Sequence, residues 1–284
     1  MLFKVNKKRS KNRGISPAIS SVIMTGAMVA ILSVTLVFAN NFLWDRVAEG
    51  DFNSSKQLMQ TIGLQIDDVA WTEGRTETTN YATQYGDVMM RPETVNYTVI
   101  VKTNAGPTYK FSNKTGIIMF NLPTSRYTIA NGYWENIFPS QHNSLTLSGT
   151  SAPVARVFAV EKVPMSDGSY IRVVVVPTIR VLYSNITTSP SDTTHYIRMY
   201  LPVLTSGESP RLTDTITLSG QSVKAYTITD VQSLNVKASF EAGSDFNSDF
   251  FNFPFDFEDL SSSGGDDVVL EFYLSEVSVS FGIN

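Results

Sequence analysis

A charge-free stretch near the N-terminus constrains this chain more than any other feature. No charged side chain lies between Arg13 and Asp45, and residues 15–43 within this stretch are predominantly apolar. Because a helix rises ~1.5 Å per residue, this segment exceeds the ~20 residues needed to cross the hydrocarbon core of a bilayer. We therefore expect residues 15–43 to form a transmembrane helix.

The first 14 residues form a short basic leader that sets the expected orientation. It carries six basic side chains and no acidic one: Lys4, Lys7, Lys8, Arg9, Lys11 and Arg13. Basic residues mark the cytoplasmic side of a membrane helix, so the N-terminus is predicted in the cytoplasm and the C-terminal domain outside the cell. Residues 15–284 carry 16 basic and 26 acidic side chains, a net charge of −10, which argues against nucleic acid as a partner.

Small residues within the apolar segment predict a face for helix packing. Ser16 is predicted to cap the helix and Pro17 to lie in its first turn. Gly26 and Ala30 are four positions apart and therefore share one face. In an apolar environment small side chains let two helices approach closely, so Gly26 and Ala30 form a candidate helix-packing site. An ordinary lipid-facing anchor can carry the same spacing, so both interpretations stay open.

The junction between leader and helix resembles the N-terminus of archaeal type IV pilin-like proteins. It reads Lys11-Asn12-Arg13-Gly14-Ile15-Ser16-Pro17-Ala18-Ile19 and continues into the apolar segment. In that family a prepilin peptidase recognises a class III signal peptide and cuts after a small residue that follows a basic one. The resemblance, which covers residues 8–43, implies a cut between Gly14 and Ile15, with Lys11 and Arg13 as the charges before it.

The resemblance also implies a function and partners. The chain would be a structural subunit of a type IV pilus-like filament, a pilin or minor pilin, anchored in the membrane before assembly and extracellular afterwards. Its partners would be the prepilin peptidase, a pilus assembly ATPase with its membrane platform, and other copies of the chain associating through the N-terminal helix. Ile19 stands where bacterial pilins usually carry Glu, which weakens a bacterial assignment.

Two other interpretations of the N-terminus compete with this one. An uncleaved single-pass anchor would make the chain a surface or envelope protein that presents β-sandwich binding domains. A cleaved secretory signal could instead end at the small-x-small pattern of Val37-Phe38-Ala39. That signal is disfavoured, because the apolar region of Ile15–Leu36 would span 22 residues where ~7–15 are expected.

Residues 44–74 are predicted to extend the helix in amphipathic form. Apolar side chains recur there at three- and four-residue spacing: Leu58, Met59, Ile62, Ile66 and Val69. This period is typical of a helix with one buried face. Residues 50–55 combine a glycine with potential capping side chains, so a kink or a restart of the helix is predicted there.

Residues 75–284 are predicted to form an extracellular β-rich domain. Ten segments have the composition of strands: Val95–Lys102, Tyr109–Phe111, Gly116–Phe120, Val154–Val163, Tyr170–Tyr183, His195–Leu204, Thr213–Leu218, Val223–Thr229, Leu234–Phe240 and Val268–Phe281. The predicted fold class is therefore α+β, a long N-terminal hydrophobic helix followed by an antiparallel, sandwich-like head. The head could be one domain or two β subdomains, divided at residues 187–194 or 206–211.

Three turns are predicted between these strands. Turn-forming residues cluster at Asn104–Pro107, Ser166–Ser169 and Ser219–Gly220. The Asp167-Gly168 pair inside the second cluster predicts a hairpin that joins residues 156–163 to residues 170–176.

No pattern in the sequence indicates an enzyme, and no catalytic, cofactor-binding or metal-binding residue is predicted. The chain has no Cys, and its two histidines, His142 and His195, are expected to be surface residues. Residues 241–271 hold nine acidic side chains, which could bind Ca²⁺, but their spacing matches no calcium loop and a solvated surface is favoured. Within this segment four phenylalanines alternate with other residues and are expected to pack into the core or to contact another subunit: Phe251, Phe253, Phe255 and Phe257.

Four sequons offer candidate glycosylation sites. They begin at Asn53, Asn96, Asn113 and Asn185. Chance predicts about as many in a chain of this composition, so their number alone indicates nothing. The predicted export of the C-terminal domain makes modification feasible at each of them.

Overall fold

The computed structural model describes residues 17–82, 85–104, 106–127, 129, 132–140, 144–161, 169–189, 192–207, 214–240, 260–261 and 267–282. These residues form one long helix, α1 (Pro17–Ala70), and thirteen strands arranged in two sheets. The chain divides into two units, Met1–Arg46 and Val47–Asn284. The second unit, called the head below, contains the amphipathic end of α1 together with all of the strands.

Helix α1 runs without interruption through residues 50–55, so the predicted restart of the helix at that point is wrong. Phe52 and Ser55 are buried on the inner side of the helix, and the hydroxyl of Ser55 donates to the carbonyl of Phe52 over 2.7 Å. Asn53 and Ser54 are exposed and form no cap of a new helix. Packing of the inner side therefore overrides the local capping signals, as tertiary contacts commonly do.

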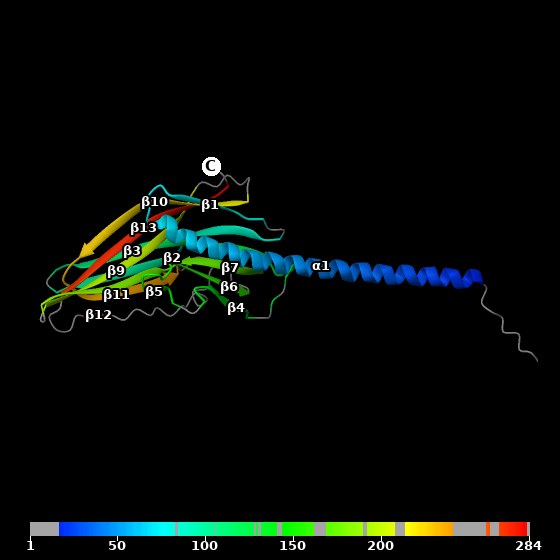
Figure 1. The fold of residues 1–284 in the computed structure, drawn as a ribbon, viewed down its shortest axis with the longest axis horizontal. Helices are drawn as coiled ribbons and strands as arrows, with labels where there is room; N and C mark the ends of the chain where they lie inside the picture. Colours follow the sequence, from blue (N-terminus) through cyan, green and yellow to red (C-terminus); the bar gives the residue numbers. More distant parts are fainter. Residues whose placement is uncertain are drawn as a thin grey trace, which may run out of the picture. The chain divides into compact units, whose positions relative to one another are not determined.

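Sheet A has six strands in the order β1-β10-β13-β9-β8-β5, and sheet B has seven in the order β12-β11-β2-β3-β7-β6-β4. The strands of sheet A are β1 (Thr76–Asn80), β5 (Thr146–Ser148), β8 (Ile179–Ser189), β9 (Asp192–Ser206), β10 (Thr215–Ile228) and β13 (Asp267–Phe281). The strands of sheet B are β2 (Asp87–Thr103), β3 (Thr108–Pro123), β4 (Trp134–Phe138), β6 (Ala155–Glu161), β7 (Tyr170–Pro177), β11 (Val231–Phe240) and β12 (Leu260–Ser261). Figure 1 shows the strands of the head, with the cyan end of α1 lying across them.

The predicted fold class is confirmed, with two additions that the sequence did not indicate. The pairing is mostly antiparallel, but β13 pairs with β9 and β5 pairs with β8 in parallel. Each sheet also draws strands from both halves of the head, and the sheets share one core. The alternative of two β subdomains in tandem is therefore not observed, and residues 187–194 join the antiparallel strands β8 and β9.

The middle of sheet B is buried on both faces. In β3, Ile117 and Met119 enter the core between the two sheets, whereas Ile118 and Phe120 enter a second core that contains the inner side of α1. Strands β6 and β7 alternate in the same way. Burial on two faces explains why β7 includes the unbroken apolar run 173–176, which would be unusual in a strand with one solvent-exposed face.

The amphipathic end of α1 supplies one wall of this second core. Of its predicted apolar side chains, Leu58 is partly buried against this core, and the other four are fully buried: Met59, Ile62, Ile66 and Val69. Gly63 lies between them, and a Cβ at that position would be 3.0 Å from the side chain of Val157 on β6. The helix therefore packs closely on sheet B because its inner side is apolar and locally small.

The predicted turn at Ser219–Gly220 is wrong, because both residues lie inside the continuous strand β10. The pairing of β10 with β13 shifts register between Gly220 and Ser222, which marks a bulge. A Cβ at Gly220 would lie 2.6 Å from the carbonyl oxygen of Thr72, so the glycine allows the chain leaving α1 to approach the strand. The amide of Gly74 donates to the carbonyl of Gly220 over 2.9 Å and secures that approach.

The other two predicted turns agree with the strand pairing as far as the structure describes it. Residues 104–107 connect β2 and β3, which form an antiparallel pair. Strands β6 and β7 pair antiparallel as the predicted hairpin requires, although its turn at Asp167-Gly168 lies outside the described residues. Four short strands, β1, β4, β5 and β12, were not predicted.

Candidate functional site

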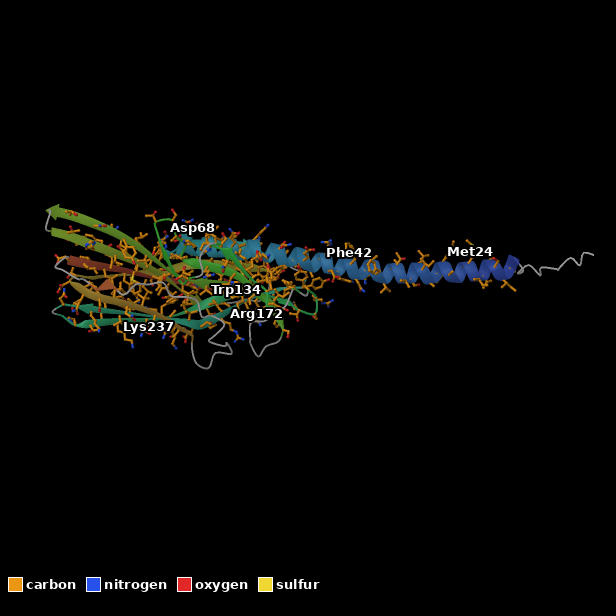
Figure 2. All side chains as sticks on the ribbon, turned by 90° about the horizontal axis from the view of Figure 1, so that it is seen from below. Met24, Phe42, Asp68, Trp134, Arg172 and Lys237 are labelled. Atoms are coloured by element: carbon orange, nitrogen blue, oxygen red, sulfur yellow. The ribbon has the colours of Figure 1, made fainter. Side chains whose placement is uncertain are left out.

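The apolar part of α1 is the most distinctive surface of the chain. Fifteen large hydrophobic side chains between Ile19 and Trp44 are each at least 42% exposed. Figure 2 shows two of them, Met24 and Phe42, projecting from the helix. The segment has no charged residue, and the helix is long and apolar enough to span a membrane. This part of α1 therefore has the length and composition expected of a membrane-spanning segment.

Three hydroxyl groups within this segment bond to carbonyls of the helix itself. Ser21 donates to the carbonyl of Ala18 over 2.9 Å, Ser33 to that of Val29 over 2.8 Å, and Thr35 to that of Ile31 over 2.8 Å. An unpaired hydroxyl costs several kcal/mol in a solvent without hydrogen-bonding groups, so these bonds suit a helix surrounded by lipid or by other helices.

The candidate packing residues Gly26 and Ala30 lie on the exposed surface of this helix. No other side chain lies within 4 Å of a Cβ built at Gly26. A second helix could therefore approach the backbone there, as the small-residue spacing predicts. Ile19, at the position where bacterial pilins usually carry Glu, is 55% exposed.

Aromatic and charged residues mark the end of the apolar segment. Phe42 and Trp44 precede the first charges, Asp45 and Arg46, and the guanidinium carbon of Arg46 lies 5.2 Å from the centre of the Phe42 ring. Aromatic side chains followed by charges are typical of the boundary between the hydrocarbon core and water. The C-terminal limit of the apolar segment therefore lies at residues 42–46.

The predicted processing site is not described by the structure. Lys11, Arg13, Gly14 and Ile15 all precede Pro17, the first described residue. The cut between Gly14 and Ile15 therefore remains a prediction from the sequence.

The four sequons differ in accessibility. Asn185 and Thr187 on β8 are exposed, whereas Asn96 and Asn113 are half-buried in β2 and β3. Asn53 is exposed, but Ser55, the third residue of its sequon, is 1% exposed within α1. The folded chain therefore offers Asn185 most openly for modification.

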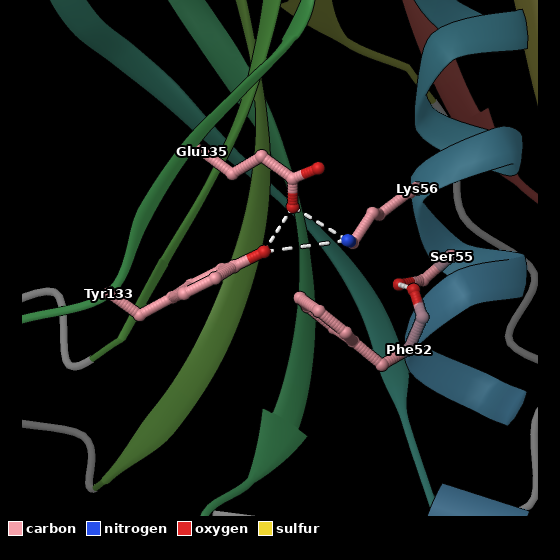
Figure 3. Close-up of polar contacts among 5 residues, drawn as sticks. All are labelled: Phe52, Ser55, Lys56, Tyr133 and Glu135. Carbon is pink, nitrogen blue, oxygen red and sulfur yellow. Dashed lines mark hydrogen bonds and ion pairs between the residues drawn. The ribbon is translucent and has the colours of Figure 1, made fainter. Parts of the chain in front are cut away.

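A polar cluster that sequence reasoning did not predict joins α1 to the edge strand β4 (Figure 3). The ammonium of Lys56 on α1 lies 2.6 Å from the carboxylate of Glu135 on β4 and 3.4 Å from the hydroxyl of Tyr133, which also donates to Glu135. The same ammonium lies 4.6 Å from the centre of the Phe52 ring, a favourable cation–π distance. Three interactions therefore converge on one lysine and hold β4 against the helix.

The electrostatics of this cluster favour its charged form. Burial raises the pKa of the Glu135 carboxyl, but the hydrogen bonds from Lys56 and Tyr133 outweigh burial, and the net pKa is below its usual value. Burial and the neighbouring carboxylate raise the pKa of Tyr133, so its hydroxyl stays protonated and donates. Lys56 and Tyr133 are 77 residues apart, which explains why the sequence carries no local signal of the cluster.

Of the remaining candidates, only some fall within the described residues. His195 lies in β9, opposite Asn185, while His142 and Phe251 to Phe257 are outside the described part of the chain. Most of the acidic segment 241–271 is outside it too; of its two described acids, Asp267 is exposed and Glu271 pairs with Arg198 over 2.6 Å. Among the described residues, no group of three or more His, Asp or Glu side chains could hold a metal ion.

No protein-family model, curated protein or solved structure matches this chain.

Proposed function

We propose that the chain is a subunit, pilin or minor pilin, of an archaeal type IV pilus-like filament. A prepilin peptidase would remove the leader between Gly14 and Ile15. The apolar part of α1 would anchor the subunit in the membrane before assembly and pack against the same segment of other copies afterwards. An assembly ATPase with its membrane platform would drive that transfer.

The observation that carries the proposal is a charge-free helix with large exposed apolar side chains and internally bonded hydroxyls. Fully burying one such side chain is worth about 1.5–3 kcal/mol, so covering fifteen of them amounts to tens of kcal/mol. That sum exceeds the ~5–15 kcal/mol that stabilises a typical folded domain. The segment therefore needs an apolar environment, and both lipid and a bundle of like helices provide one.

Transfer between these two environments is physically reasonable for this helix. Its backbone groups remain paired within the helix in either place, and the hydroxyls of Ser21, Ser33 and Thr35 bond to backbone carbonyls about one turn away. Packing among helices in an apolar solvent depends on close approach, which the open surface at Gly26 permits. The head would remain outside the membrane because its net charge and polar surface keep it in water.

The second candidate function is a surface or envelope protein held by an uncleaved single-pass anchor. The same exposed helix supports it, and its β-rich head would serve as a binding domain. The two proposals differ at the junction, since only the filament subunit requires cleavage after Gly14.

The test is a pair of leader variants expressed in the native host. Gly14→Leu should block the peptidase, leave the chain in the membrane at full length, and abolish extracellular filaments seen by electron microscopy. Ser10→Leu adds the same side chain four residues earlier and should mature and assemble normally. Normal filaments made by the Gly14→Leu variant would contradict the proposal.

A further inference from the structure

A row of side chains crosses the face of sheet A that packs against α1, beside the C-terminal end of that helix. Ala225 on β10 is paired with Tyr273 on β13, Tyr273 with Tyr200 on β9, and Tyr200 with Arg180 on β8. Neighbouring positions in β8, β9 and β13 belong to the core between the sheets. The row therefore lies on the opposite face, where its members are only partly covered.

The aromatic rings of this row form a stack that ends at Tyr273. The rings of Tyr200 and Tyr273 lie 4.8 Å apart and are nearly parallel, with an angle of 7° between them. The guanidinium of Arg180 lies 4.9 Å from the Tyr200 ring, and Trp71 meets that ring edge-on at 5.2 Å. The Tyr200 ring is thus contacted by Arg180, Trp71 and Tyr273. The cross-strand neighbour of Tyr273 on the side away from Tyr200 is Ala225.

Ala225 leaves a shelf beside the ring of Tyr273. Ala225 is exposed, and its side chain is a single methyl group, which does not reach as far from the sheet as the tyrosine ring. The side of the Tyr273 ring that faces β10 therefore lies above a small residue. A flat group about the size of a six-membered ring could stack there without moving the backbone.

The arginines around the shelf are paired with carboxylates. Arg180 pairs with Asp67 over 3.1 Å, and Arg198 pairs with Glu271 over 2.6 Å. The hydroxyl of Tyr273 donates to the same Glu271 carboxylate over 3.3 Å. Each arginine thus has a carboxylate partner, and the exposed Glu73 beside the shelf accepts from the amide of Val223 over 3.1 Å, so the surroundings carry no surplus of positive charge and disfavour an anion. The shelf offers an aromatic face with charged hydrogen-bonding groups at its edge.

We propose that this shelf binds a pyranose ring of a neutral glycan. A pyranose presents a face of C–H groups, which suits the electron-rich face of Tyr273, and a rim of hydroxyls. Those hydroxyls could donate to Glu271 and accept from Arg198, whose side chain is 41% exposed, in charge-assisted hydrogen bonds. A neutral ligand of this kind matches both the ring-sized space and the absence of surplus positive charge.

This inference goes beyond assembly and does not depend on it. The shelf is made by β9, β10 and β13, and it would be present whether the chain is a filament subunit or an uncleaved anchor. Failure of glycan binding would therefore leave the proposed filament function untouched, and failure of leader cleavage would leave the shelf untouched.

The test measures binding of methyl pyranosides to the full chain. The protein is kept in lauryldimethylamine oxide, because alkyl glycoside detergents would themselves present a pyranose. Saturation-transfer NMR is recorded with methyl glucopyranoside, methyl galactopyranoside and methyl mannopyranoside. We expect saturable transfer to the ring C–H protons of at least one of them, with the strongest transfer on one face of the ring.

Two variants and one control locate the binding. Ala225→Leu fills the shelf and Tyr273→Ala removes the aromatic face, and each should weaken binding at least tenfold. Tyr109→Ala removes an exposed tyrosine on β3, 40% exposed, and should bind like the unaltered chain. Because Ala225 is exposed, Ala225→Leu is expected to unfold at the unaltered temperature and to report on the site even if Tyr273→Ala does not fold.

Three outcomes would overturn the proposal. The first is no saturable transfer to any of the three pyranosides. The second is binding that Ala225→Leu leaves unchanged, which would place the glycan elsewhere. The third is that Nα-acetyl-lysine amide binds at the shelf and the pyranosides do not, which would make Tyr273 a contact for a cationic protein side chain.

Discussion

Single residues determine how α1 meets the strands of the head. Gly220 lets the chain after Val69 approach β10, and Lys56 ties the helix to Glu135 on β4. Both contacts join residues far apart in the sequence, and both depend on side-chain size or charge that a single substitution changes. Their contributions can therefore be measured one at a time.

Gly220→Ala is expected to destabilise the head. The added Cβ would overlap the carbonyl oxygens of Val69 and Thr72, which belong to the backbone and cannot rotate away. Overpacking of this kind typically costs about 1–3 kcal/mol, and urea denaturation of the full chain in detergent would measure it. Gly50→Ala is the matched control, because nothing lies within 4 Å of its Cβ and the helix should gain up to about 1 kcal/mol. Equal stability of the two variants would contradict this account of Gly220.

Glu135→Gln is expected to destabilise the head at pH 7 and to have a smaller effect in acid. The pKa of Glu135 is lowered in the folded chain, so its contribution is present above the unfolded pKa of about 4.3 and is lost as pH falls through the folded pKa. The side chain is 38% exposed, so solvent screening limits the effect at pH 7 to about 1 kcal/mol or less. Urea midpoints of both chains between pH 7 and pH 3 would show whether the difference disappears in acid.

At the scale of elements, the two parts of α1 have different surroundings. Between Ile19 and Trp44 large apolar side chains are exposed, whereas the inner side of the helix from Ala48 to Ala70 is buried in the head. The charges at Asp45 and Arg46 separate the two parts. The first part is therefore available to lipid or to other helices, and the second is committed to the core.

Gly26→Leu is expected to impair assembly without loss of membrane anchoring. Leucine makes the segment more apolar, so insertion should be retained, but its side chain would fill the open surface that a neighbouring helix needs. Membrane fractionation should show normal anchoring, and electron microscopy should show few or no filaments. Val22→Leu, at an exposed position that already carries a branched side chain, should assemble normally. Full assembly of Gly26→Leu would exclude a packing role for this face.

The elements with strong periodic patterns could be predicted from the sequence. The apolar segment, the inner side of α1 and long strands such as β2 and β13 can each be recognised from residues that lie close together in the sequence. The short edge strand β1 is polar throughout, so its pairing with β10 depends on a distant partner and leaves no local pattern. Gly220 was misassigned to a turn because a glycine that permits close approach and a glycine that permits a turn look alike in the sequence.

The candidate sites also differ in whether their residues lie close together in the sequence. Gly26 and Ala30 could be predicted because one helix presents them together. The Tyr273 shelf and the Lys56 cluster could not, since each combines residues that come together only in the folded sheets. A hint was available in the alternation of Tyr196, Arg198 and Tyr200, which places all three on one face of a strand.

At the scale of the whole molecule, the proposed function combines a head that buries its apolar side chains in two cores with a helix segment that exposes them. The head has its own two cores, and neither includes a residue of the apolar segment between Ile19 and Trp44. The apolar segment, in turn, gains a large free energy from any environment that covers it. A filament whose interior is built from such segments would satisfy both requirements.

The most direct test of the central claim is the N-terminal residue of the native protein in filaments sheared from the cell surface. Mass spectrometry of the N-terminal peptide should find a chain that begins at Ile15, because the leader is removed after Gly14 before assembly. A chain that still begins at Met1, or that is found only in the membrane fraction, would contradict the filament function and favour the uncleaved anchor.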